Sequence, residues 1–357
     1  MKDGKDENGR RRRKQEGQDS KRPQGKFVGL DIGYGHTKIV TQDGEQVMFP
    51  SAVALVAPTA VQQFGAPVAD DEVVIDRIRC IVGTRAIGKP NRCTDLEDLW
   101  WIFPSFKAIV TYASTWIPPQ STVITGLPLH HYIAPDARDI VHDLVKSILK
   151  AKRVLVTPQG VGAFYSDLSQ LHATTKVAIV DIGTWTTELI AMTGNDFIGT
   201  LSTGVVAGVH DIYRTVAQEL SEKLDRTVDP YEVERSNRGD GEIRAQGRAY
   251  AQSWIDERVA QLAKDRAALI LAKMVDLWGD HAPDFESVLF CGGGAQLLFP
   301  YLKGYRDGAI LMKNAQYANA VGFLKMGELL YGQDTTPVTD EPAVTQTEAG
   351  ATQSIAV

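Results

Sequence analysis

Cysteine is scarce in this sequence, and its few copies form no pattern. Cys80, Cys93 and Cys291 are the three cysteines among 357 residues, with no Cys-x-x-Cys spacing and no His-rich tract beside them. Zinc sites and disulfide frameworks need closer or paired spacing, whereas scattered cysteines are typical of proteins that fold in a reducing compartment. We therefore predict a cytoplasmic protein without a cysteine-based metal site.

Long apolar runs are also missing. No stretch approaches the roughly 18 consecutive apolar residues of a membrane span, and the N-terminus lacks the apolar core of a secretory signal. The content of 43% hydrophobic and 23% charged residues is ordinary for a globular protein. We expect no membrane partner.

Both ends of the chain lack the apolar residues that a packed core requires. Residues 1–26 carry ten Lys/Arg and five Asp/Glu, whereas residues 332–357 carry four acids and no base, within a chain of net charge −6. Such segments cannot offset the entropy of ordering, so we predict two disordered tails. The basic tail is either a solvated extension or a weak, salt-sensitive contact with DNA or another polyanion.

The part between the tails is too long for one compact core, since domains average roughly 100–200 residues. An internal repeat indicates how it is divided. The segment from Val28 reads Val-Gly-Leu-Asp-Ile-Gly-Tyr-Gly-His-Thr-Lys, and the segment from Val177 reads Val-Ala-Ile-Val-Asp-Ile-Gly-Thr-Trp-Thr-Thr-Glu. Each has an apolar strand, a turn and a β-rich return, with Gly44 or Gly194 at the next turn. The repeat predicts two related lobes, each opening with a β-hairpin.

The remaining pattern alternates strands with helices. We predict strands at 121–127, 153–157 and 287–291, and helices at 135–152, 208–224 and 244–278. Residues 227–241, with Asp-Pro and many charges, are predicted to form an exposed, irregular insertion. The aromatic stretch 99–103 is interpreted as buried packing or a contact surface in preference to a ligand platform.

The two hairpin turns have the residues of a phosphate site. Glycine turns bring backbone N–H groups close to a phosphate chain because no side chain blocks the approach. The candidate donors are Gly33, Gly35, Gly183, Thr37, Thr184, Thr186 and Thr187, and Lys38 adds a cation near the β- and γ-phosphates.

Asp31 and Asp181 end the first strand of each hairpin. A carboxylate there can hold Mg²⁺ directly or through its waters. The alternative is that each one only caps its turn by accepting backbone N–H bonds. Their occurrence at matching positions favours the metal role.

A third motif is Gly292-Gly293-Gly294 followed by Ala295, which comes directly after a predicted strand. Such a turn leaves room for an adenine and its ribose against the backbone. The Walker lysine pattern and the spaced dinucleotide fingerprint are both missing.

With these three motifs in order, the chain resembles the superfamily of actin, chaperone and sugar-kinase ATPases. Within it, the chain is most similar to plasmid-segregation actins of the ParM/StbA type. Residues 156–165 and 314–323 resemble the segment before phosphate-2 and the C-terminal connecting helix of that family. The resemblance covers about 27–331.

The resemblance implies an α/β, two-lobed actin-like (ribonuclease-H-like) fold with a nucleotide cleft between duplicated lobes. Lobe I would span 27–176, lobe II 177–312, and a C-terminal helix at 313–331 would return to lobe I. ATP, with GTP as the other option, would bind with Mg²⁺ held by Asp31 and Asp181.

The resemblance also assigns residues to the nucleotide. The phosphate-1 turn would be Gly33, Tyr34, Gly35, His36, Thr37 and Lys38. The phosphate-2 turn would be Gly183, Thr184, Trp185, Thr186 and Thr187. The adenosine site would be Gly292, Gly293, Gly294 and Ala295, with Gly204 at a helix start beside the nucleotide. Trp185 departs from the family, since relatives often have glycine there.

Catalysis is assigned to Gln159, Asp181, Asp31 and Lys38. ParM has glutamate where this chain has Gln159, so Gln159 is expected to orient water without acting as a base, and hydrolysis is expected to be slow.

The function implied is a polymerising ATPase whose filaments move plasmid DNA through a DNA-binding adaptor. The alternatives are a small-molecule kinase, which needs an acceptor pocket, and an ATP-binding scaffold that does not polymerise.

Overall fold

The computed structural model describes residues 27–56, 70–93, 100–167 and 175–332. The tails predicted at 1–26 and beyond Gly332, and Leu99 of the aromatic stretch, lie outside these ranges. Within the described ranges, no helix combines the length and the apolar character needed to cross a bilayer.

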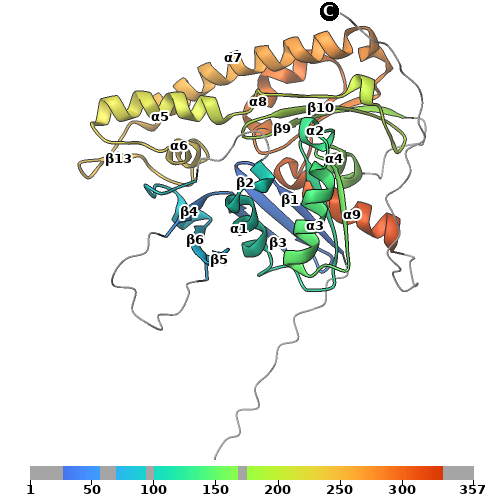
Figure 1. Cartoon of the computed structure of the whole chain (residues 1–357). Coiled ribbons are helices and arrows are strands. Elements are labelled where there is room, and N and C mark those ends of the chain that lie inside the picture. Colours follow the sequence, from blue (N-terminus) through green and yellow to red (C-terminus); the bar gives the residue numbers. More distant parts are fainter. Residues whose placement is uncertain (1–26, 57–69, 94–99, 168–174, 333–357) are drawn as a thin grey trace, which may run out of the picture.

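The first half of the chain is built on a five-stranded sheet with the order β3-β2-β1-β7-β8 (Figure 1). Its strands are β1 Phe27–Ile32, β2 His36–Thr41, β3 Gln46–Pro50, β7 Thr122–Leu127 and β8 Arg153–Pro158. The first three pair antiparallel, and β1, β7 and β8 pair parallel. A smaller antiparallel sheet lies beside it, made of β4 Val53–Leu55, β5 Glu72–Ile75 and β6 Ile78–Val82.

The helices of this half are short, apart from two that cover the main sheet. They are η1 Thr84–Ala86, η2 Trp100–Ile102, α1 Pro104–Ala113, α2 Leu129–Tyr132, α3 Ala137–Leu149 and α4 Val161–Ser166. The indoles of Trp100 and Trp101 are buried against the main core, so the packing interpretation is confirmed for these two residues, whereas Ile102 is 50% exposed.

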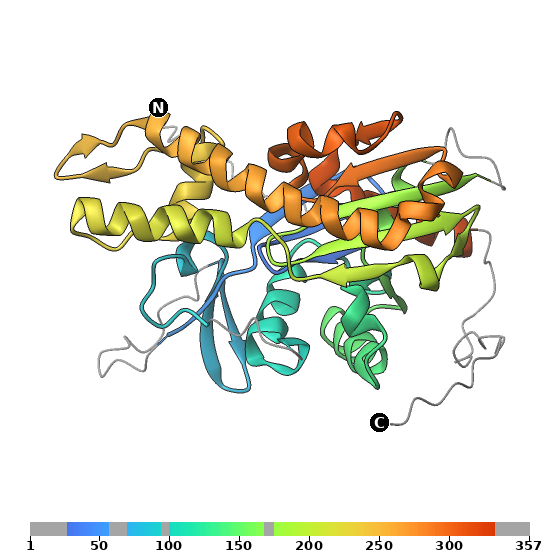
Figure 2. The same ribbon diagram turned by 90° about the horizontal axis from the view of Figure 1, so that it is seen from above.

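The second half repeats the plan around a sheet of order β11-β10-β9-β15-β16, with β12 also paired to β10. Its strands are β9 Lys176–Ile182, β10 Thr187–Thr193, β11 Asp196–Phe197, β12 Thr203–Val205, β15 Ser287–Cys291 and β16 Ala309–Leu311. Its helices are η4 Gly199–Leu201, α5 His210–Leu224, α6 Pro230–Asn237, α7 Gln252–Trp278, η5 Gly279–Asp284, α8 Ala295–Leu302, η6 Lys303–Tyr305 and η7 Ala315–Tyr317. The long α7 runs along one face of this sheet, as Figures 1 and 2 show.

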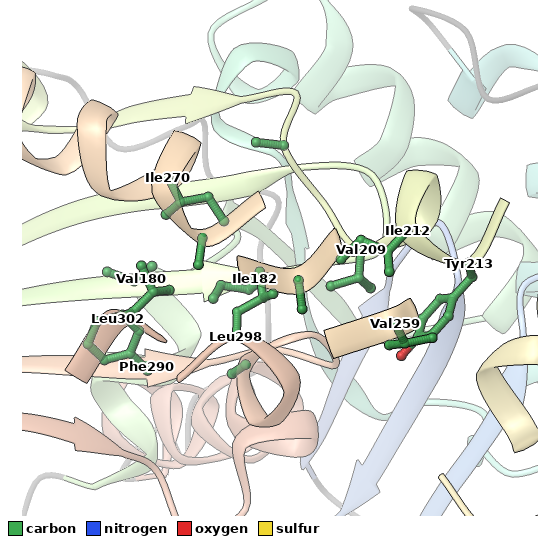
Figure 3. Close-up of a cluster of buried hydrophobic side chains, with 14 of the residues drawn as sticks. Val180, Ile182, Val209, Ile212, Tyr213, Val259, Ile270, Phe290, Leu298 and Leu302 are labelled. Carbon is green, nitrogen blue, oxygen red and sulfur yellow. The ribbon is translucent and has the colours of Figure 1, made fainter. Parts of the chain in front are cut away.

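Each sheet has its own hydrophobic core. In the second half, Val180, Ile182 and Phe290 on the strands pack against Ile212 of α5 and Ile270 of α7 (Figure 3). These side chains come from positions that alternate on strands and recur every three or four residues on helices, which is why both patterns are visible in the sequence. The predicted strands and the helices α3 and α5 are confirmed to within a few residues.

The last helix, α9 Ala318–Tyr331, returns from the second half to the first. It packs on β1 and α4, and its last aromatic ring, that of Tyr331, lies 4.2 Å from the guanidinium carbon of Arg153 on β8. The predicted two-lobed actin-like architecture is therefore present, with α9 joining the two sheets.

Two predictions of local structure are wrong. Residues 244–249 form a hairpin of β13 Arg244–Ala245 and β14 Arg248–Ala249, and the helix begins only at Gln252. The reason is the turn between them, where Gln246 and Gly247 have φ of 49° and 79°. Two successive left-handed residues are the geometry of a tight hairpin turn and end any helix.

The second error concerns 227–241, which holds the ordered helix α6. Asp229 caps α6 by accepting the Tyr231 N–H at 2.9 Å, and the Glu232 side chain accepts the Asp229 N–H at 3.1 Å. This reciprocal capping box satisfies backbone donors that water would otherwise bind. Val233 is fully buried, so the segment is part of the core and not an irregular insertion.

Candidate functional site

A cavity lies where the two hairpin turns and the glycine turn after β15 meet. Its lining includes thirteen residues of the predicted site: Asp31, Gly33, Tyr34, Gly35, His36, Lys38, Gln159, Asp181, Gly183, Thr184, Thr186, Gly292 and Gly293. The topology brings them together because β1 and β9 both point their carboxyl ends at this place. Crevices at the carboxyl ends of parallel strands are the usual ligand sites of α/β proteins.

The first hairpin presents a carboxylate and a cation. Asp31 on β1 lies directly opposite Lys38 on β2, and Lys38 Nζ contacts Asp31 Oδ2 at 3.0 Å. Gln159, at the end of β8, donates its amide N–H to Asp31 Oδ1 at 3.2 Å and to the Ile32 carbonyl at 3.4 Å. The Gln159 carbonyl oxygen is thereby the end of the amide left to accept a hydrogen bond.

The second hairpin presents a carboxylate of a different kind. Asp181 on β9 accepts a 2.6 Å hydrogen bond from the Asn319 amide of α9. Burial and the nearby charge of Asp31 raise the pKa of Asp181 to about 6. The Asn319 carbonyl accepts hydrogen bonds from the N–H groups of Gly160 and Ala163, each at 3.1 Å. This one amide therefore connects α9, α4 and the second hairpin by hydrogen bonds.

The tips of the two turns touch. A Cβ at Gly35 would overlap the hydroxyl of Thr184, so only glycine allows this approach. Gly292 has a φ of 88°, and a Cβ there would overlap the Asp181 carboxylate and the Ile182 carbonyl. These two glycines are therefore required by contact and by backbone conformation, independently of any ligand.

Behind the second turn lies a residue that the sequence reading missed. Glu188 on β10 stands opposite Asp181 and accepts the Leu129 N–H at 3.0 Å. Burial is the main reason that its pKa rises to about 8, and Asp181 adds to the rise. Glu188 is therefore a neutral carboxylic acid near pH 7. It occupies the position that Lys38 has in the first hairpin.

Helix α6 supplies a further wall that the sequence reading also missed. Glu234 and Arg238 line the cavity and form an ion pair at 2.8 Å. Burial, together with the charges of Lys38 and Arg238, lowers the pKa of His36 to about 3, so His36 is neutral. The signal that could have found α6 was the Asp229-Pro-Tyr-Glu232 sequence, a capping box with proline at the first helical position.

Six predicted residues lie outside the cavity lining. Thr37 bonds the Ser51 hydroxyl at 2.9 Å, and the Thr187 hydroxyl donates to the Ala207 carbonyl at 2.9 Å. Gly294 and Ala295 begin α8, and the aromatic ring of Trp185 stacks on His210 at 4.1 Å. The sixth is Gly204 on β12.

Gly204 in particular is not at a helix start. It lies in β12 opposite Glu188, and a Cβ there would lie 2.9 Å from the Glu188 carboxylate. Its lack of a side chain makes room for the buried carboxyl group, which is a structural reason for glycine at this position.

A second hollow adjoins the cavity on the outer side of the turns. Tyr34, Gly35, Thr184 and Glu234 line both. Two of its lining residues, Arg92 near the small sheet and Asp229 at the start of α6, form an ion pair with 2.8 Å between Nη1 and Oδ2. This ion pair links the two halves of the molecule on the side away from α9.

The cavity has the donor set of a Mg²⁺–phosphate site. Within the described ranges, no group of three or more His, Cys, Asp or Glu side chains could hold a metal ion by itself. Mg²⁺ does not need such a cage, because it is commonly held by one or two carboxylates together with substrate phosphates and waters. Asp31 and Asp181 fit this requirement, and the raised pKa of Asp181 marks a place where a cation would relieve repulsion.

Comparisons with known proteins agree with the two-lobed fold. The model "Actin like proteins N terminal domain" matches residues 29–162, and "Archaeal actin homologue MreB-like, C-terminal" matches residues 179–304. Curated proteins called "Archaeal actin homolog" from Thermoplasma volcanium and Thermoplasma acidophilum are 22% identical over 331 residues, covering 84% of this chain and 98% of theirs.

Solved structures give the same result at the level of the fold. A 15-stranded ParM filament from Clostridium botulinum matches with a TM-score of 0.69 and 21% identity, covering 85% of this chain and 99% of that one. An archaeal actin homolog in complex with ADP matches with a TM-score of 0.66 and 20% identity, at the same coverage.

Proposed function

This chain belongs to the actin-like superfamily, and from that premise we propose that it binds a magnesium nucleoside triphosphate and assembles into nucleotide-dependent filaments. We further propose that these filaments segregate plasmid DNA in the cytoplasm through a DNA-binding adaptor. ATP is the expected nucleotide, with GTP as the other option.

One observation carries the proposal. Two hairpins with the same register place Asp31, Lys38 and Asp181 around one cavity, and the glycine turn after β15 closes its far side. A polyphosphate needs a cation, backbone N–H groups and carboxylates that can hold a metal, and the residues for each of these meet in the cavity. Beside Asp181, the turn at Gly292 and Gly293 offers backbone for a nucleoside, and the position of a Cβ at Gly293 is open to 3.8 Å.

Each residue has a defined role in this scheme. Lys38 exchanges its contact with Asp31 for one with the terminal phosphates. Asp31 and Asp181 hold Mg²⁺ or its waters, and the metal, when bound, neutralises charge on the phosphates. The N–H groups of Gly33 and Gly183 are not free for phosphate, since they donate to the carbonyls of His36 at 3.2 Å and Thr186 at 2.8 Å. The remaining turn N–H groups, such as that of Gly35, would meet the phosphates.

Hydrolysis would be slow, and its rate would depend on how the attacking water is positioned. The Gln159 amide nitrogen is bound to Asp31 and to the Ile32 carbonyl, so its carbonyl oxygen is directed to accept from an attacking water. A glutamine can orient that water but cannot remove its proton. Rates in phosphoryl transfer depend mainly on positioning and electrostatic stabilisation, which one oriented carbonyl supplies only in part.

The filament part of the proposal rests on the fold and on its relatives. The similar ParM structure is a filament, and the match covers 99% of that chain. The basic tail at 1–26 would add a weak contact with DNA beside the adaptor.

The test is assembly in solution. The purified full chain is mixed with Mg-ATP or Mg-GTP, and light scattering is followed together with phosphate release, with negative-stain images at the plateau. Filaments that grow with nucleotide and shorten after phosphate release support the proposal. Asp181→Ala is the control that should bind nucleotide weakly and release no phosphate.

Two other outcomes decide between the alternatives. Nucleotide binding without assembly across a range of salt and protein concentration would contradict the filament function and favour a scaffold. Phosphate transfer to an added small molecule, without assembly, would favour a kinase, for which the hollow beside Tyr34 and Trp185 is the available acceptor site.

A further inference from the structure

One buried amide in the cavity lining contacts both halves of the molecule. Asn319, the second residue of α9, is 6% exposed and lines the cavity. Its amide nitrogen donates to Asp181 Oδ2 at 2.6 Å, and its carbonyl oxygen accepts the N–H groups of Gly160 and Ala163, each at 3.1 Å. Backbone N–H groups can only donate and an ionised carboxylate can only accept, so the orientation of this amide is fixed at both ends.

On the first half, the Asn319 carbonyl takes the place of a missing helix cap. The first N–H groups of a helix have no partner within it, and the side chain of the residue before the helix usually accepts one of them. The residue before α4 is Gly160, which has a φ of 83° and no side chain that could accept the Ala163 N–H. Asn319 accepts it instead, so the start of α4 is held by α9.

The start of α4 comes directly after Gln159. The Gln159 N–H donates to the Leu127 carbonyl of β7 at 2.7 Å, and the next N–H, that of Gly160, donates to Asn319. The backbone that carries the Gln159 side chain is therefore held by β7 on one side and by Asn319 on the other. A displacement of Asn319 would also displace the amide that is expected to orient water.

Helix α9 is a rigid support for Asn319 because its backbone lies against the backbone of α4. A Cβ at Gly322 would overlap the Gly162 carbonyl, and a Cβ at Gly162 would lie 2.7 Å from the backbone carbonyl of Asn319. Glycine at both positions allows this close approach. One side chain on a fixed helix therefore sets the separation between Gly160 and Asp181.

We propose that Asn319 is a positioning residue for nucleotide hydrolysis, which holds Gln159 of the first half and Asp181 of the second half in a fixed relative position. This inference rests on the proposed function, in which Gln159 orients the attacking water and Asp181 holds Mg²⁺ or its waters. The contacts proposed for Lys38 and the turn N–H groups do not involve Asn319. Its loss should therefore slow hydrolysis much more than it weakens nucleotide binding.

The first test is a double-mutant cycle between Asn319→Leu and Gln159→Ala, measured with the full chain as single-turnover phosphate release from Mg-ATP or Mg-GTP. Asn319→Leu should lower the rate about 30-fold, because a small misplacement of a reacting group is costly, and should weaken nucleotide affinity in calorimetric titration only about threefold. In the Gln159→Ala background it should lower the rate less than about threefold, since the group that it positions is already absent. Rate effects that multiply would overturn the proposal, because a general loosening of the fold does not depend on Gln159.

The second test requires neither an Asn319 variant nor a nucleotide. It is needed because Asn319→Leu leaves two buried N–H groups without an acceptor, which lowers stability. Hydrogen exchange of residues 160–166 is compared between the parent chain and Asp181→Ala, which removes the acceptor of the Asn319 amide nitrogen. Exchange should be about tenfold faster in Asp181→Ala, the ratio expected for one lost buried hydrogen bond. Asp265→Ala, at an exposed position on α7, is the matched control and should leave the exchange unchanged.

The two tests separate this inference from the proposed function. Unchanged exchange in Asp181→Ala would overturn the inference even if the chain hydrolysed Mg-ATP, because the amide would then not link the two halves. A parent chain that hydrolyses neither ATP nor GTP would contradict the proposed function, whereas faster exchange in Asp181→Ala would still support the link through Asn319.

Discussion

The two hairpins at the cavity have the same backbone and different chemistry. In both, the first strand ends in Asp-Ile-Gly, and the glycine N–H closes the turn by donating to the carbonyl three residues later. In the first hairpin the residue opposite the aspartate is Lys38, which pairs with Asp31 at 3.0 Å. In the second it is Glu188, which shares a buried region with Asp181.

The difference shows that two hairpins with the same backbone can carry a lysine cation in one copy and a protonated carboxylic acid in the other. Lys38 neutralises Asp31 without external help. The Asn319 amide, the charge of Lys38 and the Cys291 thiol all stabilise the Asp181 carboxylate, but burial and the charge of Asp31 outweigh them and raise its pKa to about 6. Under the proposed function, this asymmetry suits phosphate recognition at the first hairpin and metal binding mainly at the second.

The largest effect is expected when the first hairpin is given a glutamate where the second hairpin has one. Lys38→Glu removes the cation and adds a carboxylate beside Asp31, so affinity for a magnesium nucleoside triphosphate should fall about 1,000-fold, consistent with loss of a buried charge partner. Calorimetric titration measures the loss. Lys264→Glu, exposed on α7, controls for net charge, and a Lys38→Glu variant with unchanged affinity would refute the assigned role.

A smaller effect is expected at Gln159, whose amide is anchored to the first hairpin. Gln159→Ala should lower the rate of phosphate release about 100-fold while nucleotide affinity changes by less than about threefold, because the lost group orients water only in the transition state. Single-turnover phosphate release measures the rate. Hydrolysis at the parental rate would show that another group places the water.

The second hairpin can be tested through pH without any ligand. The pKa of Glu188 is about 8 in the folded chain and 4.5 in a model compound, so the folded state retains a proton that the unfolded state loses. The free energy of unfolding should therefore fall as pH rises from 4.5 to 8, by about 1.4 kcal/mol per pH unit from this group. Asp181, with its pKa near 6, adds a smaller fall between 3.8 and 6.

Glu188→Gln should remove that part of the slope, since its amide oxygen still accepts the Leu129 N–H. Urea unfolding at a series of pH values measures it, with the exposed Glu222→Gln as the matched control. An unchanged slope would mean that Glu188 is ionised in the folded protein.

The smallest expected effect concerns the ion pair Arg92–Asp229, which joins the two halves beside the turns. Its side chains are 31% and 18% exposed, so solvent screens it and its coupling should be about 0.5–1 kcal/mol. Asp229→Asn keeps the helix cap of α6 and removes the charge. A double-mutant cycle combines this variant with Arg92→Met. Loss of the ion pair should speed the release of a fluorescent nucleotide about twofold to fivefold. Additive single effects would show that the pair does not couple the halves.

Much of this architecture could be predicted from the sequence because it depends on short sequence motifs. Apolar runs that end in Asp-Ile-Gly turns predicted the two hairpins, and the apolar run before Gly292 predicted the strand there. The predictions for 244–249 and for α6 were wrong because both elements depend on backbone details. The hairpin depends on a left-handed Gln246-Gly247 turn and α6 on a capping box, and the charge-rich composition of these segments indicates neither.

The sequence by itself determined the two repeated hairpins, the positions of Asp31, Lys38 and Asp181 on them, and the glycines that their close approach requires. These follow from side-chain size, chain periodicity and backbone conformation, which act over a few residues. Only the tertiary structure decided that Asn319, Arg238 and Gln316 join the cavity and that Glu188 carries a proton. Contacts between segments far apart in the chain, and the desolvation of a buried carboxyl group, exist only once the two sheets have packed.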